Sequence, residues 1–180
     1  MLVVIGGGPG AGKTTVLGEL ERRGFKHVAE VARQIIQEQV RDGGNALPWS
    51  DTARYCALML KRSIASYEEH ASREFASVEV TFFDRGIPDT LCYARLVGLP
   101  EDQIVEACRK YRYAQRVFLA PPWKEIYARD AERKQSFGEA ERTYELMTQT
   151  YEDCGYEVVE IPRVSVEERV DFILSMMRGE

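Results

Sequence analysis

The chain has 180 residues, of which 44% are hydrophobic and 29% charged, so it suits one domain with a full core and is not a disordered chain. The formal net charge is −5, and there is no long run of Lys or Arg, which argues against a nucleic-acid partner. No apolar run approaches the roughly 20 residues of a membrane span, so we expect no membrane partner.

Cysteine spacing and the amino terminus bear on the cellular compartment. The four cysteines are far apart and include no CxxC pair. The apolar start of the chain is too short for a signal peptide and lacks its basic region. We therefore expect reduced thiols and a cytoplasmic protein. With two histidines in the chain, a zinc site is not expected.

Short apolar runs alternate with helical patterns along the chain. The runs that we expect to be strands are 2–5, 25–29, 78–83, 116–120 and 157–161. Apolar residues at spacings of three and four predict helices at 14–23, 31–40, 53–71, 89–97, 100–110, 136–155 and 165–177. This alternation predicts an α/β fold with a mostly parallel sheet, in a single domain over residues 1–180. Ligands of such sheets bind where the strands end, so we expect the site residues there.

Three helices carry a recognisable start in the sequence. Ser50 can cap the long helix that follows the loop 45–51. Ser136 with Glu139, and Ser165 with Glu168, have the spacing of a capping box.

The first strand leads into the glycine-rich stretch GGGPGAGKTT, residues 6–15. It fits the pattern GxxxxGK[ST] between a predicted strand and a predicted helix. Glycines let several N–H groups surround an anion, and the helix start adds its dipole. A glycine-rich turn without a ligand is the weaker alternative. We therefore predict that nucleotide phosphates bind Gly7, Gly8, Gly10, Ala11, Gly12, Lys13, Thr14 and Thr15, with Lys13 catalytic and Thr14 a Mg²⁺ ligand.

The second strand is followed by Glu30, and Arg33 lies one helical turn later. A kinase needs a carboxylate that accepts the proton or hydrogen bond of the attacking hydroxyl. Glu30 is thus a candidate catalytic residue, and Glu30 and Arg33 are candidate substrate-binding residues. The alternatives are a carboxylate favoured by the helix dipole at Glu30 and an exposed helix charge at Arg33.

The third strand ends in Asp84-Arg85. Mg²⁺ on a phosphate loop needs a carboxylate opposite the Thr14 hydroxyl, and we expect Asp84 to supply it, in a metal, substrate-binding or catalytic role. Arg85 is a candidate substrate contact, with a solvated arginine as the equal alternative. A turn-capping role is the alternative for Asp84. For Asp89, the N-cap of the next helix is slightly favoured over a ligand role.

The segment 121–142 follows the fourth strand and is dense in charge. Its arginines and Gly138 suit a hinged lid that closes on ATP and neutralises charge on the transferred phosphoryl group. We take Arg129 and Arg133 as candidate catalytic residues and leave the role of Arg142 open. The alternative is a solvated helix with many ion pairs.

Together these stretches resemble a P-loop kinase-like ATPase family, typified by the ribosylnicotinamide kinase domain of NadR and often described as AAA-type ATPases. The matching stretches are GGPGAGKTT, AEVARQII, FFDRGIPDTLCYA and ARDAERKQSFGEAER, and they occur in the right order over nearly the whole chain. The Asp-Arg step is also similar to that of thymidylate and deoxynucleoside kinases. In those kinases an aromatic residue or serine usually follows, whereas Gly86 follows here.

The resemblance implies a P-loop NTPase fold with three α/β/α layers, a five-stranded parallel sheet in the order 2-3-1-4-5 and a helical lid. It also implies ATP and Mg²⁺ at the phosphate loop. A second substrate would lie between Glu30, the long helix and the Asp84-Arg85 step.

Two functions follow from these residues. The leading one is a small-molecule kinase that transfers the γ-phosphoryl group of ATP to a nucleoside-like or nucleotide-like acceptor. The alternative is a nucleotide-dependent ATPase or GTPase switch without a small-molecule acceptor. Charged groups after the second and third strands favour the kinase, because a switch needs no second pocket. The chain has no Asn/Thr-Lys-x-Asp step of the kind used for guanine, so we expect ATP. The acceptor and the oligomeric state stay open.

Overall fold

The computed structural model describes the chain except for residues 9, 75–78, 127–135 and 178–180. Its sheet has five parallel strands, in the order β2-β3-β1-β4-β5. This confirms the parallel sheet and its expected order. The strands are β1 (Leu2–Gly7), β2 (Lys26–Val28), β3 (Thr81–Asp84), β4 (Arg116–Ala120) and β5 (Glu157–Glu160).

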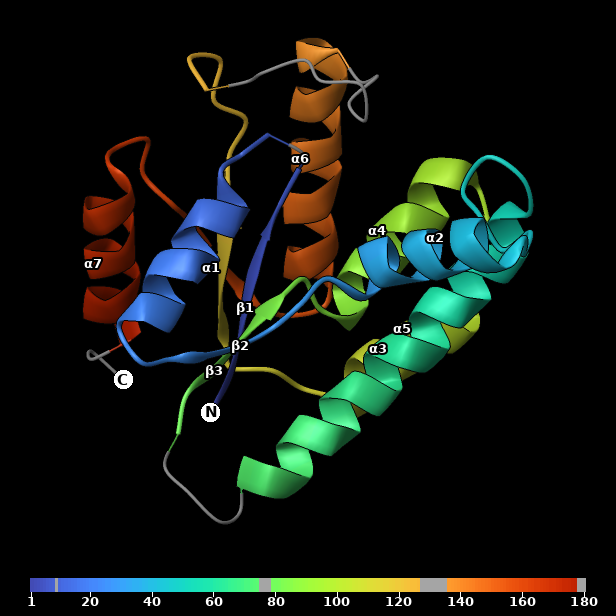
Figure 1. Cartoon of the computed structure of the whole chain (residues 1–180), viewed down its shortest axis with the longest axis horizontal. Coiled ribbons are helices and arrows are strands. Elements are labelled where there is room, and N and C mark those ends of the chain that lie inside the picture. Colours follow the sequence, from blue (N-terminus) through green and yellow to red (C-terminus); the bar gives the residue numbers. More distant parts are fainter. Residues whose placement is uncertain (9, 75–78, 127–135, 178–180) are drawn as a thin grey trace.

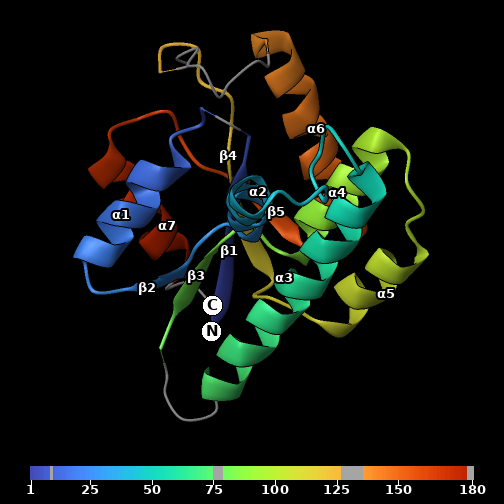
Figure 2. The same ribbon diagram turned by 45° about the vertical axis from the view of Figure 1, so that its right-hand side comes forward.

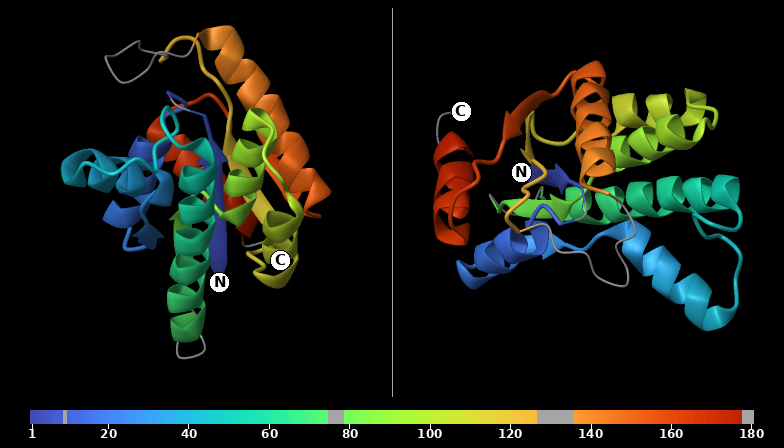
Figure 3. Two further views of the ribbon diagram at one scale, coloured as in Figure 1. Left: turned by 90° about the vertical axis from the view of Figure 1, so that its right-hand side faces the viewer. Right: turned by 90° about the horizontal axis from the view of Figure 1, so that it is seen from above.

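Helices cover both faces of this sheet, as the views from three sides show (Figures 1, 2 and 3). The helices α1 and α7 lie on one face and α3, α4, α5 and α6 on the other, while α2 packs on α3. The fold therefore has the three expected layers. The helices are α1 (Lys13–Arg22), α2 (Val31–Asp42), α3 (Thr52–Glu74), α4 (Ile87–Val97), α5 (Asp102–Lys110), α6 (Phe137–Asp153) and α7 (Val166–Met177).

The central strand β1 is buried on both faces, which explains its unbroken apolar sequence. Leu2 and Val4 face the core under α3 to α6, whereas Val3 and Ile5 face the core under α1 and α7. A third, smaller cluster joins α2 to α3. Packing on both faces fixes β1, and so it fixes the loop that leaves its carboxyl end.

Two helix starts differ from the expectation. The helix α4 begins at Ile87, and its Asp89 accepts a hydrogen bond from Gly86 N at 2.8 Å. Asp89 thus caps the helix from its first turn, so its expected N-cap position is wrong. For α3, Asp51 Oδ1 accepts from Arg54 N at 3.0 Å, so Asp51 rather than Ser50 is the cap.

Both predicted capping boxes are confirmed. Glu139 N donates to Ser136 Oγ at 3.3 Å, and Ser136 N donates to the Glu139 carboxylate. Ser165 and Glu168 make the same pair of bonds at the start of α7. Within the described residues, no helix has the length and apolar character that crossing a membrane requires.

Gly7 and Gly18 predict opposite effects of the same substitution. Gly7 has φ +134°, and a Cβ there would lie 2.5 Å from the backbone oxygen of Ala120. Gly7→Ala should therefore lower the free energy of unfolding by at least about 1–3 kcal/mol. Gly18 lies exposed within α1 with nothing near its missing Cβ, so Gly18→Ala should raise it by about 1 kcal/mol.

Urea unfolding of both variants measures the two changes. A stabilising Gly7→Ala would contradict the backbone geometry of the β1–α1 turn, and a destabilising Gly18→Ala would contradict the open surroundings of Gly18 in α1.

Candidate functional site

The predicted phosphate loop connects β1 to α1 at the carboxyl end of the sheet. Gly7, Gly10 and Gly12 have positive φ angles of 134°, 78° and 77°, which only glycine adopts without strain. Such a turn directs successive N–H groups toward one side and makes an anion-binding concavity. Thr14 is exposed at the first turn of α1, and Thr15 Oγ1 donates to Gly12 O at 2.7 Å.

Lys13 lies buried at the start of α1. The residue is 8% exposed, and Nζ donates to Gly7 O at 2.9 Å. Burial and, to a smaller extent, the positive charge of Arg85 lower the pKa of Lys13 to about 8, against the opposing effect of nearby carboxylates. Lys13 thus holds a charge that water does not stabilise, close to the loop.

The Asp-Arg step at the end of β3 has a strained backbone. Arg85 has φ 76°, a left-handed conformation that is uncommon outside glycine. Its N–H donates to Ile5 O at 3.1 Å. Its Nε donates to Glu30 Oε1 at 2.8 Å, and Nη1 donates to Asp89 Oδ1 at 3.2 Å. The side chain of Arg85 therefore links Glu30, before α2, to Asp89 in α4.

Asp89 is itself held from a third direction. Its carboxylate is buried and accepts a hydrogen bond from Tyr151 Oη, in α6, at 2.5 Å. A Cβ on Gly86 would lie 3.1 Å from both Val4 and Tyr113. The close packing of Val4 and Tyr113 on Gly86 favours glycine after the Asp-Arg step. Tyr151 was not predicted, because its helical pattern marks it only as a core residue.

The pKa values of Glu30 and Asp84 shift in opposite directions. Burial alone would raise the pKa of Glu30, but Arg85 and Lys13 outweigh burial and lower it. Burial raises the pKa of Asp84 despite the same two cations. Burial also disfavours the charge of Arg85, yet the surrounding carboxylates raise its pKa. The ionised form of Glu30 is therefore stabilised by its neighbours, whereas the two cations do not fully offset the cost of burying the charge of Asp84.

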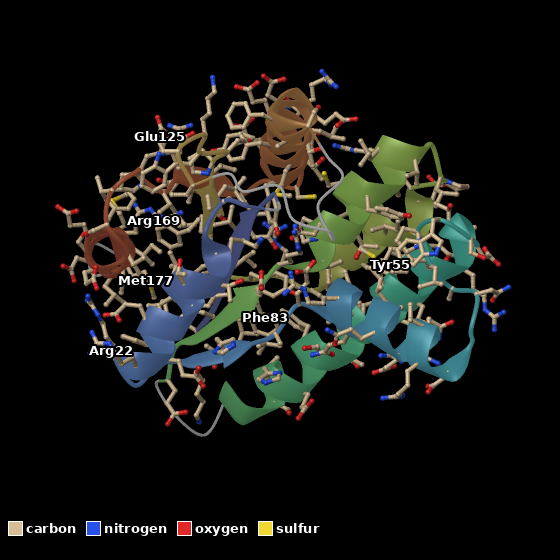
Figure 4. The ribbon with its side chains drawn as sticks, turned by 45° about the horizontal axis from the view of Figure 1, so that its top comes forward. Arg22, Tyr55, Phe83, Glu125, Arg169 and Met177 are labelled. Atoms are coloured by element: carbon tan, nitrogen blue, oxygen red, sulfur yellow. The ribbon has the colours of Figure 1, made fainter. Side chains whose placement is uncertain are left out.

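A small pocket lies beside this cluster. Its enclosed volume is about 20 Å³, room for about one water molecule. Two buried atoms of its lining residues, Asp84 Oδ1 and Thr90 Oγ1, have no hydrogen-bond partner among the described residues. In Figure 4, Phe83 marks the β3 side of this pocket. The pocket is lined by Val28, Ala29, Val31, Ala32, Met59, Ser63, Ser66, Phe83, Asp84, Arg85, Gly86, Asp89, Thr90 and Tyr113.

The remaining predicted residues lie around or beyond this cluster. Arg33 is exposed in α2, and its charge acts on Glu30. Arg142 is exposed in α6. Arg129 and Arg133 fall outside the described residues. Gly138 lies in the first turn of α6 rather than in a loop, so it does not form the expected hinge.

Similarity to solved structures extends over the whole fold. The chain is 14% identical to deoxyadenosine kinase from M. mycoides with the products dCMP and dCDP bound, with a TM-score of 0.60 and full coverage of both chains. It is 22% identical to the NadR protein in complex with NR, with a TM-score of 0.65. That match covers 99% of this chain and 50% of NadR. At these identities the likeness shows the fold.

A second structure of the M. mycoides kinase, with dATP bound, is 16% identical with a TM-score of 0.57 and covers 99% of each chain. No curated protein matches the chain. A family model described as an AAA domain matches residues 2–169. The chain therefore belongs to this AAA domain family, and its fold is that of the P-loop kinases.

Proposed function

We propose that the protein is an ATP- and Mg²⁺-dependent kinase for a small, nucleoside-like or nucleotide-like acceptor. One observation carries this proposal: Asp84 and Arg85 line a pocket, Glu30 is hydrogen-bonded to Arg85, and the charges of all three act on Lys13 of the phosphate loop. A nucleotide switch needs the loop but no second set of charged groups. The kinase fold of the chain, and nucleotide-bound kinases among the similar structures, add support.

In this proposal the phosphate loop binds the nucleotide. Its backbone N–H groups, those of Gly7, Gly8 and residues 10–15, surround the phosphates, and the dipole of α1 favours their charge. Lys13 contacts the β- and γ-phosphates. Their oxygen atoms replace Gly7 O, the backbone oxygen to which Nζ donates without nucleotide. Arg129 and Arg133, which we assign to a lid at 121–142, neutralise charge on the transferred group.

Thr14 and Asp84 fit a Mg²⁺ ion. Both offer hard oxygen atoms, and Asp84 Oδ1 is buried without a partner among the described residues. No group of three His, Cys, Asp or Glu side chains suited to a metal occurs in the described residues. Mg²⁺ takes one or two protein ligands and completes its shell with phosphates and water. When bound, the ion neutralises charge on the phosphates.

Glu30 and Arg85 serve the acceptor. The acceptor oxygen forms a bond to the γ-phosphorus while the bond from that phosphorus to the bridging oxygen of ADP breaks. With a hydroxyl acceptor, the proton passes to the Glu30 carboxylate, which its lowered pKa keeps ionised. Arg33 and Arg85 contribute positive charge for the acceptor. Because the enclosed pocket is about 20 Å³, an acceptor enters only as side chains at its mouth move.

Phosphoryl transfer from ATP labelled at the γ position tests the function. The acceptors to screen are nucleosides, nicotinamide riboside and nucleoside monophosphates. We expect one class to receive label and to accelerate ATP consumption. Basal ATP hydrolysis that no acceptor stimulates would contradict the kinase proposal and favour the nucleotide switch.

Glu30→Gln should lower the transfer rate by at least about tenfold, since general-base catalysis contributes 10²–10⁴-fold. Glutamine keeps the size of the side chain and an oxygen for Arg85, so ATP affinity should change little. Glu38→Gln, at an arginine-paired glutamate within α2, is the matched control. Equal rates in wild type and Glu30→Gln would remove Glu30 from the mechanism.

Lys13→Met should abolish the stabilisation of the protein by ATP, yet make the unliganded protein more stable. The pKa of Lys13 is lowered from 10.5 to about 8, so its buried charge costs up to about 3 kcal/mol at pH 7. The unfolded chain stays protonated up to about 10.5. The gain from methionine is thus full below pH 8 and disappears as the pH rises from 8 toward 10.5.

Urea unfolding at several pH values, with and without ATP, measures both effects. Lys61→Met, at an exposed lysine of α3, is the control. A Lys13→Met protein that is less stable than wild type at pH 7, or that ATP still stabilises, contradicts this assignment.

Asp84→Asn should raise the Mg²⁺ concentration at half-maximal activity by about tenfold or more. Even loss of a residue that only hydrogen-bonds to a metal ligand typically lowers metal affinity by about 10–100-fold. Asparagine preserves shape and removes the ligand charge. A Mg²⁺ titration at fixed ATP measures the shift, with Asp153→Asn in α6 as control. An unchanged half-maximal concentration would exclude Asp84 as a metal ligand.

A further inference from the structure

Arg169 of α7 lies buried against the phosphate loop. Its hydrogen-bond partner there, Ala11, is 158 positions away in the sequence. The residue is 2% exposed, and Nη2 donates to Ala11 O at 2.9 Å. Its Nη1 lies 2.7 Å from the point that a Cβ on Gly12 would occupy. Figure 4 shows Arg169 between α7 and the start of α1. A Cβ on Gly12 would therefore displace the guanidinium of Arg169, in addition to the strain that a φ of 77° imposes on other residues.

The positive charge of Arg169 has no acidic partner among the described residues. No ion pair of Arg169 is found there, and Nε is buried without a hydrogen-bond partner. Its guanidinium carbon lies 5.9 Å from the centre of the Trp123 ring, a weak cation–π contact. Burial lowers the pKa of Arg169. A buried cation of this kind is costly, and its single strong contact is to the loop.

The contact acts on one peptide unit. In a trans peptide the carbonyl of Ala11 and the N–H of Gly12 point in opposite directions. A donor that fixes the carbonyl on one side therefore fixes the N–H toward the other side. A full positive charge on the carbonyl also polarises the peptide, which strengthens its N–H as a donor.

We propose that Arg169 is a positioning residue of the phosphate loop: it holds the Ala11 carbonyl so that the Gly12 N–H faces the nucleotide phosphates. The inference rests on the proposed nucleotide site and adds a residue from the last helix to it. It does not require that the protein be a kinase, because an ATPase switch would use the same loop.

The test compares Arg169→Met and Arg169→Lys with wild type by calorimetric titration with two probes. One probe is ATP, and the other is inorganic tripolyphosphate, which has no base or sugar. Arg169→Met should weaken both by about tenfold or more, by similar factors, as expected for the loss of a charged hydrogen bond. Arg169→Lys keeps the charge and one donor, so its affinities should lie nearer to wild type.

Arg112→Met is the matched control. Arg112 also donates to carbonyls, those of Cys108 and Cys154, and lies over an aromatic ring, that of Tyr156 at 4.0 Å. It lies at the other end of the sheet, beside the start of β5. Its loss should leave both affinities unchanged. Unfolding of the unliganded variants shows which of them retain the fold.

Each outcome decides between readings. Wild-type affinity for tripolyphosphate in Arg169→Met would overturn the inference, and so would equal losses in Arg169→Met and Arg112→Met. A loss seen with ATP alone would place Arg169 at the base or sugar instead. Should Arg169→Met fail to fold, Arg169→Gln, which also removes the charge, takes its place with the same expected loss for both probes, and wild-type affinity for tripolyphosphate in that variant would overturn the inference. Wild type that binds neither probe would remove the nucleotide site itself.

Discussion

The guanidinium of Arg85 is the contact on which the candidate site depends. The left-handed backbone of Arg85 costs about 1–2 kcal/mol. Hydrogen bonds from its charged side chain, of about 1.5–3 kcal/mol each, offset that cost. These bonds go to Glu30 at 2.8 Å and to Asp89 at 3.2 Å. Because Tyr151 and Gly86 also donate to Asp89, the turn after β3 is held from α2, α4 and α6 at once. Glu30 therefore has a fixed place beside the phosphate loop.

The fold leaves its unsatisfied charges at one end of the sheet. Lys13 and Arg169 are buried cations, and Asp84 Oδ1 has no partner among the described residues. Such groups reduce the stability of the unliganded protein and are typical of functional sites. Around Lys13 and Arg85 stand three carboxylates, of Glu30, Asp84 and Asp89. This excess of negative charge suits a nucleotide that arrives with a divalent cation.

Features encoded by one short stretch of chain could be predicted from the sequence. The phosphate loop is of this kind, because its glycines are required by local φ angles. The capping boxes of α6 and α7 are another case. The strand order required the family resemblance, since no local pattern decides which parallel strands pair. The Asp-Arg step was found by its place at the end of an apolar strand.

Contacts between distant elements could not be predicted. Tyr151 and Asp89 are 62 positions apart, and their contact depends on how α6 packs on α4. In the sequence, Arg169 is one charged residue beside the acidic residues at the start of α7. Only the packing of α7 against α1 brings it to Ala11. A signal was nonetheless present, because Arg169 follows Val166 by three residues and so lies near the inward side of its helix. The candidate lid arginines, Arg129 and Arg133, stay predictions.

The direction of the γ-phosphate in a complex with a non-hydrolysable ATP analogue and Mg²⁺ tests the central claim most directly. A crystal structure of that complex should place the γ-phosphate on Lys13, with Asp84 at the metal or its water, facing the pocket beside Glu30 and Arg85. A nucleotide on the loop whose γ-phosphate faces solvent, with the Glu30–Arg85 pair far from it, would contradict the account.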